Sequence, residues 1–240
     1  MRLTLPRSVP ARIATGATAL AVIVPVGLLG ASSTATSATS ASVATPTAQA
    51  DAAAAQTVRS EESMLLSAAD LSGGWTEVSL FGHTGQATDL LKSIKVSPAS
   101  CVEGLTLPVG YQSEAHRVFK QGTSDYGPYL AQGVARFSSA ATAKAAVNEA
   151  AAKAKTCNHV SVTASQGYAG ITISKLMTKK YGSQRRGYTI DAQVMGFMPA
   201  QGKVIVVRKG RFVTVVAQGG LGTVPSSAIK AAANKATNLI

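Results

Sequence analysis

Two cysteines, Cys101 and Cys157, are the residues of this chain whose type and spacing point most directly to chemistry. A zinc site is not indicated, because no histidine–carboxylate pattern accompanies them, although His159 lies two residues after Cys157. A reactive thiol is the other alternative. In an exported protein an isolated pair is most simply a disulfide. Such a bridge would close the long loop between Cys101 and Cys157. The chain-entropy treatment assigns about 4 kcal/mol of stability to a loop of that size.

The other residues with catalytic potential form no recognisable motif. The histidines are His83, His116 and His159, and no G-x-S-x-G sequence supplies a nucleophile for them. H-E-x-x-H and Walker sequences are also absent, and the acidic residues are scattered singly apart from Glu61 and Glu62. Paired carboxylates in a cleft stay open as an alternative, but no spacing indicates them. We therefore expect no enzyme activity, no cofactor and no metal.

Cationic residues concentrate in two late runs of sequence that contain no acid. The candidate anion-binding residues are Lys175, Lys179, Lys180, Arg185, Arg186, Arg208, Lys209 and Arg211. Such a surface attracts anionic lipids, polymers or small ligands. The alternative is a solvated face that keeps the protein soluble. If the two runs lie on neighbouring strands, they merge into one surface.

The first fifty residues have the layout of a secretory signal peptide. Three arginines precede an apolar run over residues 13–30, and small residues then lead to an A-x-A site. We place cleavage after Ala50, with a site near Ala31 and an uncleaved membrane anchor as the alternatives. Residues 51–60 would then be a linker, and residues 61–240 one extracellular domain of a secreted protein.

The charge of the chain favours anionic partners. Its net charge is +12, and removal of the three signal arginines leaves +9. An exported protein of this charge is biased toward lipid head groups, wall polymers, acidic glycans or nucleic acid, and charge alone does not choose among them. We expect an anionic lipid, a wall polymer or a small ligand, with peripheral membrane contact and no specific nucleic acid. The sequence indicates no oligomeric state.

Eight segments rich in apolar residues, the first with an alternating pattern, are the predicted strands that must position these groups. They cover residues 75–81, 115–122, 129–139, 159–165, 170–177, 187–198, 202–209 and 211–220. Their hairpin-like spacing, with helices between them, predicts an α+β fold with a twisted antiparallel sheet. The last two strands flank Lys209 and Gly210. A two-residue turn there would set Arg208 opposite Arg211, so we expect a longer loop or an anionic partner at the tip.

Two helices are predicted, both rich in small residues. The first follows a cap at Ser138 or Ser139, and its apolar face is Ala143, Val147, Ala150 and Ala154. Such side chains bury little area, so the helix docks weakly, and Cys157 at its end would tie it to the loop of Cys101. The second follows a cap at Ser226 or Ser227, and its apolar face is Ile229, Ala232, Ala233, Ala236 and Ile240.

Aromatic residues supply a second candidate site. Tyr111, Tyr126 and Tyr129 flank the first predicted strand pair and could line a cleft. The alternative is that they are packed edges of the core. Trp75 follows two glycines at a strand start, where a core anchor is favoured over a binding platform.

The run from Met64 to Ile240 resembles the PknH-type extracellular sensor domain of actinobacterial receptor kinases and related secreted or lipid-anchored proteins. The matching segments are MLLSAADLSGGW, PASC, YLAQGVARFSSAATAKAAVNEA and VIVVRKGRFVTVVAQ. The resemblance implies a twisted antiparallel sheet with flanking helices and a ligand cleft. Members commonly carry two disulfides; Cys101 and Cys157 match the first pair, and the late-strand pair has no counterpart here. No kinase motif is present.

These observations favour a secreted, non-catalytic, sensor-like binding domain at the cell envelope that takes a small or anionic ligand. An envelope hydrolase with an unrecognised site and a structural protein that binds wall polymers are the alternatives. A cleft with a nucleophile would favour the hydrolase. A flat basic face without a cleft would favour the structural protein.

Overall fold

The structure is a computed structural model, and it describes residues 60–78, 95–101, 111–123, 127–164 and 167–240. The expected signal peptide and nearly all of the expected linker lie outside the described residues. The strands are β1 (Trp75–Glu77), β2 (Lys95–Ser97), β3 (Tyr111–Gln121), β4 (Tyr129–Phe137), β5 (His159–Ala164), β6 (Gly167–Lys175), β7 (Gln184–Val194), β8 (Met198–Lys209) and β9 (Phe212–Leu221). The helices are α3 (Ala140–Thr156) and α4 (Ser226–Leu239), with 3-10 turns η2 (Glu61–Met64), η3 (Ala68–Asp70) and η4 (Ala99–Cys101).

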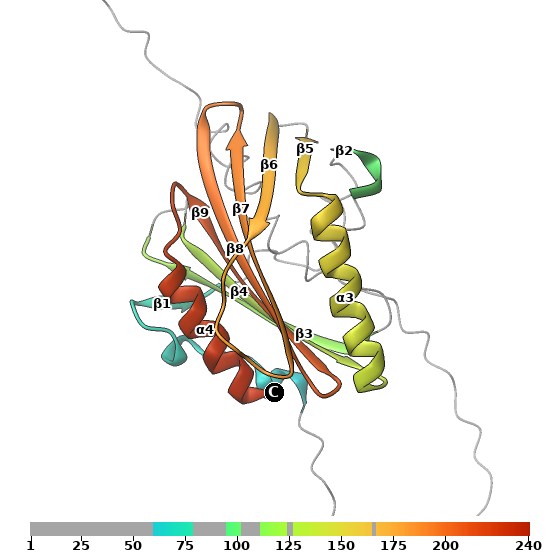
Figure 1. Ribbon diagram of the computed structural model, residues 1–240. Helices are drawn as coiled ribbons and strands as arrows, with labels where there is room; N and C mark the ends of the chain where they lie inside the picture. The colour runs from blue at the N-terminus through green and yellow to red at the C-terminus, as the bar shows by residue number, and fades with distance from the viewer. Residues whose placement is uncertain (1–59, 79–94, 102–110, 124–126, 165–166) are drawn as a thin grey trace, which may run out of the picture.

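All nine described strands join one antiparallel sheet in the order β1-β3-β4-β9-β8-β7-β6-β5-β2. The sheet is strongly twisted, and the helices flank it (Figure 1). From β3 to β4 and from β5 to β9, consecutive strands are neighbours, as the hairpin-like spacing of the sequence predicted. The predicted α+β class and single domain are confirmed.

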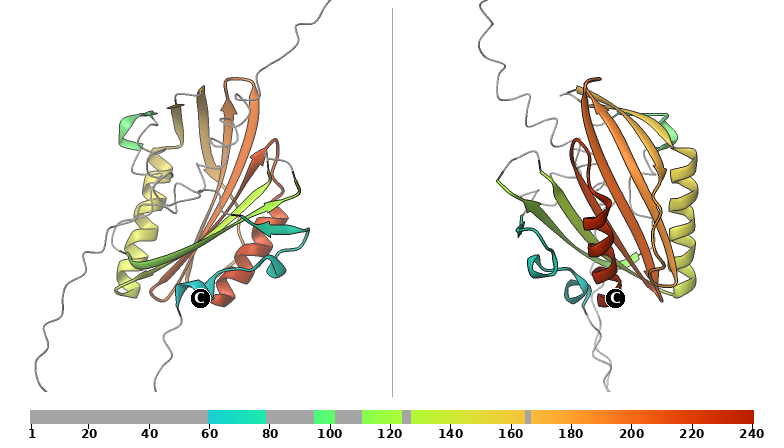
Figure 2. Two further views of the ribbon diagram at one scale, coloured as in Figure 1. Left: turned by 180° about the vertical axis from the view of Figure 1, so that it is seen from behind. Right: turned by 60° about the vertical axis from the view of Figure 1, so that its left-hand side comes forward.

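The two helices cover opposite faces of the central strands, as the right-hand view of Figure 2 shows. On one face, α3 packs against β4, β7, β8 and β9; on the other, α4 packs against β8 and β9. Val204 and Val206 belong to the core that includes α3, whereas Ile205 and Val207 belong to the core that includes α4. We call these sides of the sheet the α3 face and the α4 face. Because both are covered, β8 and β9 read as continuous apolar runs.

The β8–β9 hairpin corrects one prediction from the sequence. Its two-residue turn is Gly210–Arg211, so Lys209 pairs with Phe212 and Arg208 pairs with Val213. Gly210 has a φ of 61°, a left-handed conformation that glycine adopts at little cost. The expected longer loop is therefore wrong. Because the turn lies one residue later than expected, Arg208 and Arg211 do not face each other across the hairpin.

The helix predictions hold with small changes. Ser139 caps α3, and its side chain accepts a hydrogen bond of 3.1 Å from the backbone N–H of Thr142. Ala143 and Val147 are buried as predicted, but Ala146 takes the third buried place. The expected Ala150 and Ala154 are only partly buried.

The predicted apolar face of α4 is buried at Ile229, Ala232, Ala233 and Ala236, and Ile240 is partly exposed. The expected serine cap is wrong, because Pro225 occupies the position before the first helical residue and no side chain caps the helix.

A buried amide ties the start of the domain to the middle of the sheet. Gln132 is fully buried on β4; its Oε1 accepts from the N–H of Leu66, and its Nε2 donates to the carbonyl of Met64 at 3.1 Å. The same Nε2 lies 3.2 Å from Oγ1 of Thr214, which donates to the carbonyl of Gly133 at 3.1 Å. Buried polar groups stabilise a fold when each has a partner, as here.

We predict that Gln132→Leu lowers the free energy of unfolding by about 2–4 kcal/mol, because each buried group left without a partner costs about 1–3 kcal/mol. Urea denaturation followed by circular dichroism measures the change. Gln193→Leu, at an exposed position of β7, is the control and should change stability by less than about 0.5 kcal/mol. Equal effects of the two substitutions would contradict a role for the Gln132 contacts.

Candidate functional site

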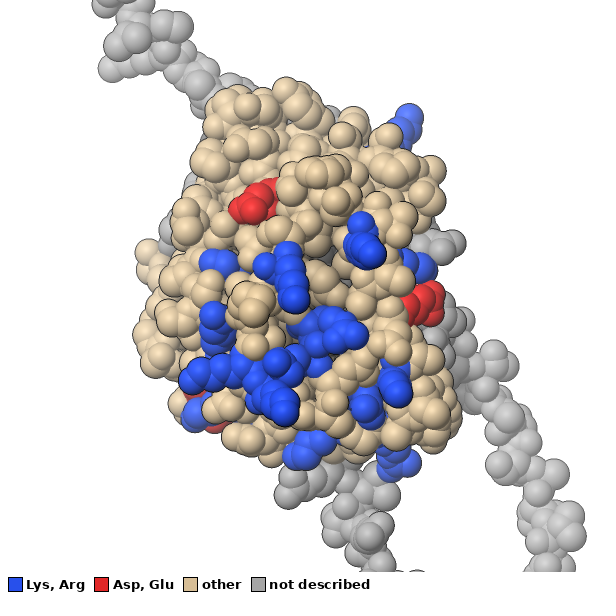
Figure 3. Space-filling model, in the orientation of Figure 1, with Lys and Arg blue, Asp and Glu red and all other residues tan. Residues whose placement is uncertain are grey.

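The two cationic runs lie on neighbouring strands, as the sequence analysis required for a shared surface. Gln184 pairs with Arg208, and Arg185 pairs with Val207, across the β7–β8 ladder. Lysine and arginine side chains gather over the lower part of the face seen in Figure 3, where acidic side chains are few. In Figure 1 this region carries α4, the start of β7 and the segment that joins β6 to β7.

The pleat of the sheet nevertheless divides the eight predicted cations. Successive residues of a strand point to opposite faces of the sheet, and paired residues share a face. Arg186 pairs with Val206, and Arg208 is two residues after Val206, so both belong to the α3 face. Lys175 on β6 belongs to the same face. Arg185 and Lys209 belong to the α4 face. The remaining three are Lys179 and Lys180, in the segment between β6 and β7, and Arg211, in the β8–β9 turn.

Some of these cations already have partners within the protein. Nε of Arg208 donates to Oε1 of Gln184 at 3.1 Å, and Nζ of Lys209 donates to the carbonyl of Ile240. The guanidinium of Arg211 lies 5.6 Å from the centre of the Phe212 ring. These three residues therefore hold the hairpin and the chain end in place. The remaining candidate anion-binding residues are Lys175, Lys179, Lys180, Arg185 and Arg186.

A groove of about 570 Å3 opens between α3 and the adjoining ends of β6 and β7. The described residues that line it are Ala151, Ala154, Lys155, Asn158, Ile173, Ser174, Lys175, Leu176, Met177, Thr178, Arg185, Arg186, Gly187 and Tyr188. We call this space the basic groove, because four of these residues are cationic and none is acidic. Its volume is in the range of small-molecule binding sites.

The groove exists because α3 fills so little space in its second half. The buried residues of α3 all precede Glu149, so the helix docks on the sheet through its first half. Further along, Ala151 and Ala154 face β6 and β7 with nothing beyond a methyl group. Larger side chains at these two positions would fill the gap and add buried apolar area. The alanine-rich sequence therefore leaves the groove open at a cost in docking energy.

The sheet side of the groove changes from charged to apolar along its length. On the α3 face, Arg186 is outermost, Lys175 and Tyr188 come next as a directly opposed pair, and Ile173 follows, opposite Ile190. Ile173 packs against the buried core of the α3 face. A ligand in the groove would thus meet cations at the strand ends and apolar carbon further in.

Among the described residues, no ion pair involves the four cations that line the groove, Lys155, Lys175, Arg185 and Arg186. Two of them make backbone contacts only: Nε of Arg185 donates to the carbonyl of Thr178 at 3.4 Å, and Nη1 of Arg186 donates to that of Arg185 at 3.0 Å. Their charges are therefore available to an anion.

Tyr188 adds a neutral hydrogen-bond donor to the same place. Burial raises the pKa of its phenol, and the nearby charge of Arg186 offsets this only in part. The phenol therefore keeps its proton at neutral pH and can donate to an anion. Beside this end of the groove a hydrogen bond links β7 to α3: Nε2 of Gln184 donates to Oδ1 of Asn148 at 2.7 Å.

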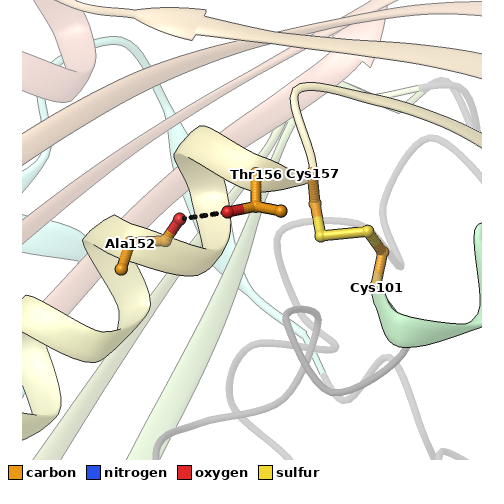
Figure 4. The surroundings of a disulfide bond; sticks show 4 residues. All are labelled: Cys101, Ala152, Thr156 and Cys157. Atoms are coloured by element: carbon orange, nitrogen blue, oxygen red, sulfur yellow. Dashed lines mark hydrogen bonds between the residues drawn. A yellow bond between two sulfur atoms is a disulfide. The ribbon is translucent and has the colours of Figure 1, made fainter.

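The disulfide holds the helical wall of the groove. Cys101 and Cys157 are bonded, which confirms the prediction, and Cys157 directly follows the last residue of α3 (Figure 4). The last turn of α3 also contains a hydrogen bond of 3.2 Å from Oγ1 of Thr156 to the carbonyl of Ala152. Both sulfur-bearing residues are buried in the core of the α3 face. The bond therefore fixes the part of α3 that carries Ala154 and Lys155.

The predicted tyrosine cleft is not formed by the described residues. Tyr111 lies beside Phe137 at one end of the β3–β4 pair, and Tyr129 lies beside Lys120 at the other. Antiparallel pairing places these two tyrosines far apart, so they do not line one cleft, and Tyr129 is buried. Tyr126 lies outside the described residues. Trp75 is buried in the core of the α4 face, as the core-anchor interpretation expected.

Sequence reasoning missed Lys155, Tyr188 and Met177 as groove residues. The helical pattern does show that Lys155 shares a face with Ala151, four residues earlier. Nothing in the sequence shows that this face lies beside β6 and β7. The side chain of Met177 is 71% exposed at the groove, which a single sequence also does not reveal.

Two other features bear on function. Within the part of the chain that the structure describes, no group of three or more His, Cys, Asp and Glu side chains could hold a metal ion. Among those same residues, no helix is long and apolar enough to cross a membrane. Nδ1 of His159 lies 3.3 Å from Oγ1 of Thr172 on the neighbouring strand, and His83 is not among the described residues.

We predict that Cys157→Ala lowers the free energy of unfolding by about 2–5 kcal/mol, because the bond constrains the unfolded chain and fixes the end of α3. Urea denaturation measures the loss, and reduction of the wild-type protein should reproduce it. Thiol labelling of the unfolded, unreduced wild-type protein is the control. Two labelled thiols in that sample would contradict the bond.

Comparison with known proteins gives a structural likeness and no sequence-based one. No family model matches the sequence, and no curated protein does. The extracellular domain of PknH from Mycobacterium tuberculosis matches with a TM-score of 0.55 and 19% identity, over 75% of this chain and 96% of that chain. An uncharacterized protein from Mycobacterium smegmatis, the Rv0999 ortholog, matches with a TM-score of 0.33 and 11% identity, over 62% of this chain and 76% of that one, which is too distant to carry an argument. The first match confirms the resemblance inferred from the sequence at the level of the fold: this chain has the fold of the extracellular domain of PknH.

Proposed function

We propose that this protein is a non-catalytic, sensor-like binding domain of the cell envelope that holds a small anionic ligand in the basic groove. The observation that carries the proposal is the meeting of three cations, Lys155, Lys175 and Arg186, around one groove of ligand size, none of them in an ion pair among the described residues. Exposed cations usually face solvent separately, whereas these converge on a concave surface from a helix and two strands.

The groove also separates this function from its two alternatives. A hydrolase needs a nucleophile with a base to activate it. The described lining offers the hydroxyls of Ser174 and Thr178, but it includes no histidine or carboxylate beside them. A structural protein that binds wall polymers by charge alone needs only a flat basic face. Convergence on a concave site therefore favours the binding of a discrete ligand.

An extracellular location is part of the proposal. The signal-peptide layout of residues 1–50, the bonded cysteine pair and the fold of an extracellular domain all support export. A ligand taken in this groove would then come from the envelope or its surroundings. The sequence contains no kinase motif.

The proposal is tested with inorganic pyrophosphate as a soluble probe, followed by backbone NMR of the purified protein. We expect shifts confined to the groove, centred on Lys175, Arg186 and Tyr188. Affinity should fall as salt rises, because the Debye length decreases from about 10 Å at 0.1 M to about 3 Å at 1 M. The double substitution Lys175→Glu, Arg186→Glu should weaken binding by about tenfold or more, since charge-assisted hydrogen bonds contribute about 1.5–3 kcal/mol each.

A control of the same net charge is available. Lys95 and Lys144 are exposed, make no ion pair among the described residues and do not line the groove. The double substitution Lys95→Glu, Lys144→Glu should change affinity by no more than about twofold. Neither pair should alter thermal unfolding much, because exposed charges contribute roughly 0–1 kcal/mol. Equal loss of binding in both variants would show attraction by net charge alone and would overturn the proposal.

A further inference from the structure

We infer that the ligand is an amphiphile: a phosphate ester that carries one apolar chain. This inference rests on the proposed function, because it names the class of ligand that the basic groove takes. The phosphate would lie at the strand ends beside Lys175 and Arg186. The chain would run inward along Ile173 and the alanine wall of α3.

The cationic end of the groove suits a phosphate better than a single carboxylate. A phosphate monoester has nearly two negative charges at neutral pH and three acceptor oxygens, whereas a carboxylate has one charge and two oxygens. Arg186 offers a planar donor set and Lys175 a compact charge, which is the combination that binds phosphate oxygens. Tyr188 sits opposite Lys175 and keeps its donor proton.

The helix favours the same orientation of the ligand. The C-terminal end of α3 forms one wall of the groove near Lys155 and Asn158. The helix dipole places partial negative charge there, which disfavours an anion close to that end. Lys155 offsets this charge. The phosphate therefore belongs at the β6–β7 side, and the wall of α3 is left to an uncharged part of the ligand.

The inner part of the groove is apolar where a simple anion site would be polar. Its walls there are Ala151, Ala154 and Ile173, and Ile173 is continuous with the buried core. At the rim, Met177 is 71% exposed, although burial of such a side chain would stabilise the fold. Methionine is flexible and polarizable, which suits contact with an aliphatic chain of variable shape.

A series of monoalkyl phosphates, from butyl to octyl, tests the inference by isothermal titration with the purified protein. All are used below the concentration at which they form micelles, with inorganic phosphate as the member without a chain. We expect affinity to rise about fourfold for each methylene that becomes buried. Lys175→Glu, Arg186→Glu should weaken every member of the series.

Two matched substitutions on α3 locate the chain. Ala154→Leu places a branched side chain in the groove, and it should abolish the dependence on chain length while inorganic phosphate still binds. Ala145→Leu, at an exposed position of the same helix outside the groove, is the control and should leave that dependence unchanged. Met177→Ser, which should not disturb folding at an exposed position, should reduce the dependence on chain length about twofold or more.

The outcomes separate this inference from the proposed function. If inorganic and alkyl phosphates bind with equal affinity in the groove, the ligand is a simple anion, and the inference fails while the function stands. If no phosphate binds, both fail. If affinity rises with chain length but Ala154→Leu and Ala145→Leu behave alike, the chain binds elsewhere and the inference is overturned.

The source of the ligand is decided with phosphatidylcholine vesicles that contain lysophosphatidic acid, a membrane phosphate monoester with one acyl chain. Sedimentation with these vesicles that is weakened by Ala154→Leu and not by Ala145→Leu supports the inference and shows that the groove takes a membrane lipid. Binding of alkyl phosphates without sedimentation also supports it and indicates a free amphiphile. Sedimentation that both variants preserve, together with alkyl phosphate affinity independent of chain length, contradicts it.

Discussion

The pairing of β8 with β9 at the centre of the sheet is the constraint on which the remaining structure depends. The two strands pair from Lys209 with Phe212 at the turn to Ala200 with Leu221 at the far end. Their alternate side chains supply both cores, with Val204 and Val206 on one face and Ile205 on the other. A one-residue slip would exchange the two sets, so the turn at Gly210 fixes the register for both helices. Everything outward from this hairpin, including the β6–β7 end that carries the groove, takes its position from it.

The groove and the disulfide are two consequences of one feature, the small side chains of α3. Alanines at 151 and 154 leave space beside β6 and β7, and the same lack of area makes this half of the helix dock weakly. At about 25 cal/mol per Å2, little hydrophobic energy holds it there. A disulfide that closes a long loop contributes about 4 kcal/mol, enough to replace several lost side-chain contacts. The disulfide between Cys101 and Cys157 thus keeps the second half of α3 attached to the domain although its side chains are small.

Much of the fold could be predicted from the sequence, because it depends on local patterns. Apolar runs predicted the long central strands, the serine at 139 predicted the start of α3, and the lone cysteine pair predicted the disulfide. The site was less accessible, because it depends on which strands are neighbours and which face each residue occupies. Antiparallel pairing separated Tyr111 from Tyr129, and the pleat divided the predicted cations between two faces. The family resemblance implied a twisted antiparallel sheet with flanking helices and a ligand cleft, but not the groove residue Lys155.

The charge of the groove also has an energetic meaning for the unliganded protein. Lys175 on β6 lies opposite Tyr188 on β7, and Arg186 lies two residues before Tyr188 on β7. Lys175 and Arg186 are therefore diagonal neighbours on one face of the sheet. Like charges at this separation repel, and no described carboxylate relieves the repulsion. Solvent screening keeps the cost small at the strand ends, but it is greater inside a groove where less water is present. In the proposed function, an anion bound between Lys175 and Arg186 would relieve this repulsion and would stabilise the folded protein by mass action.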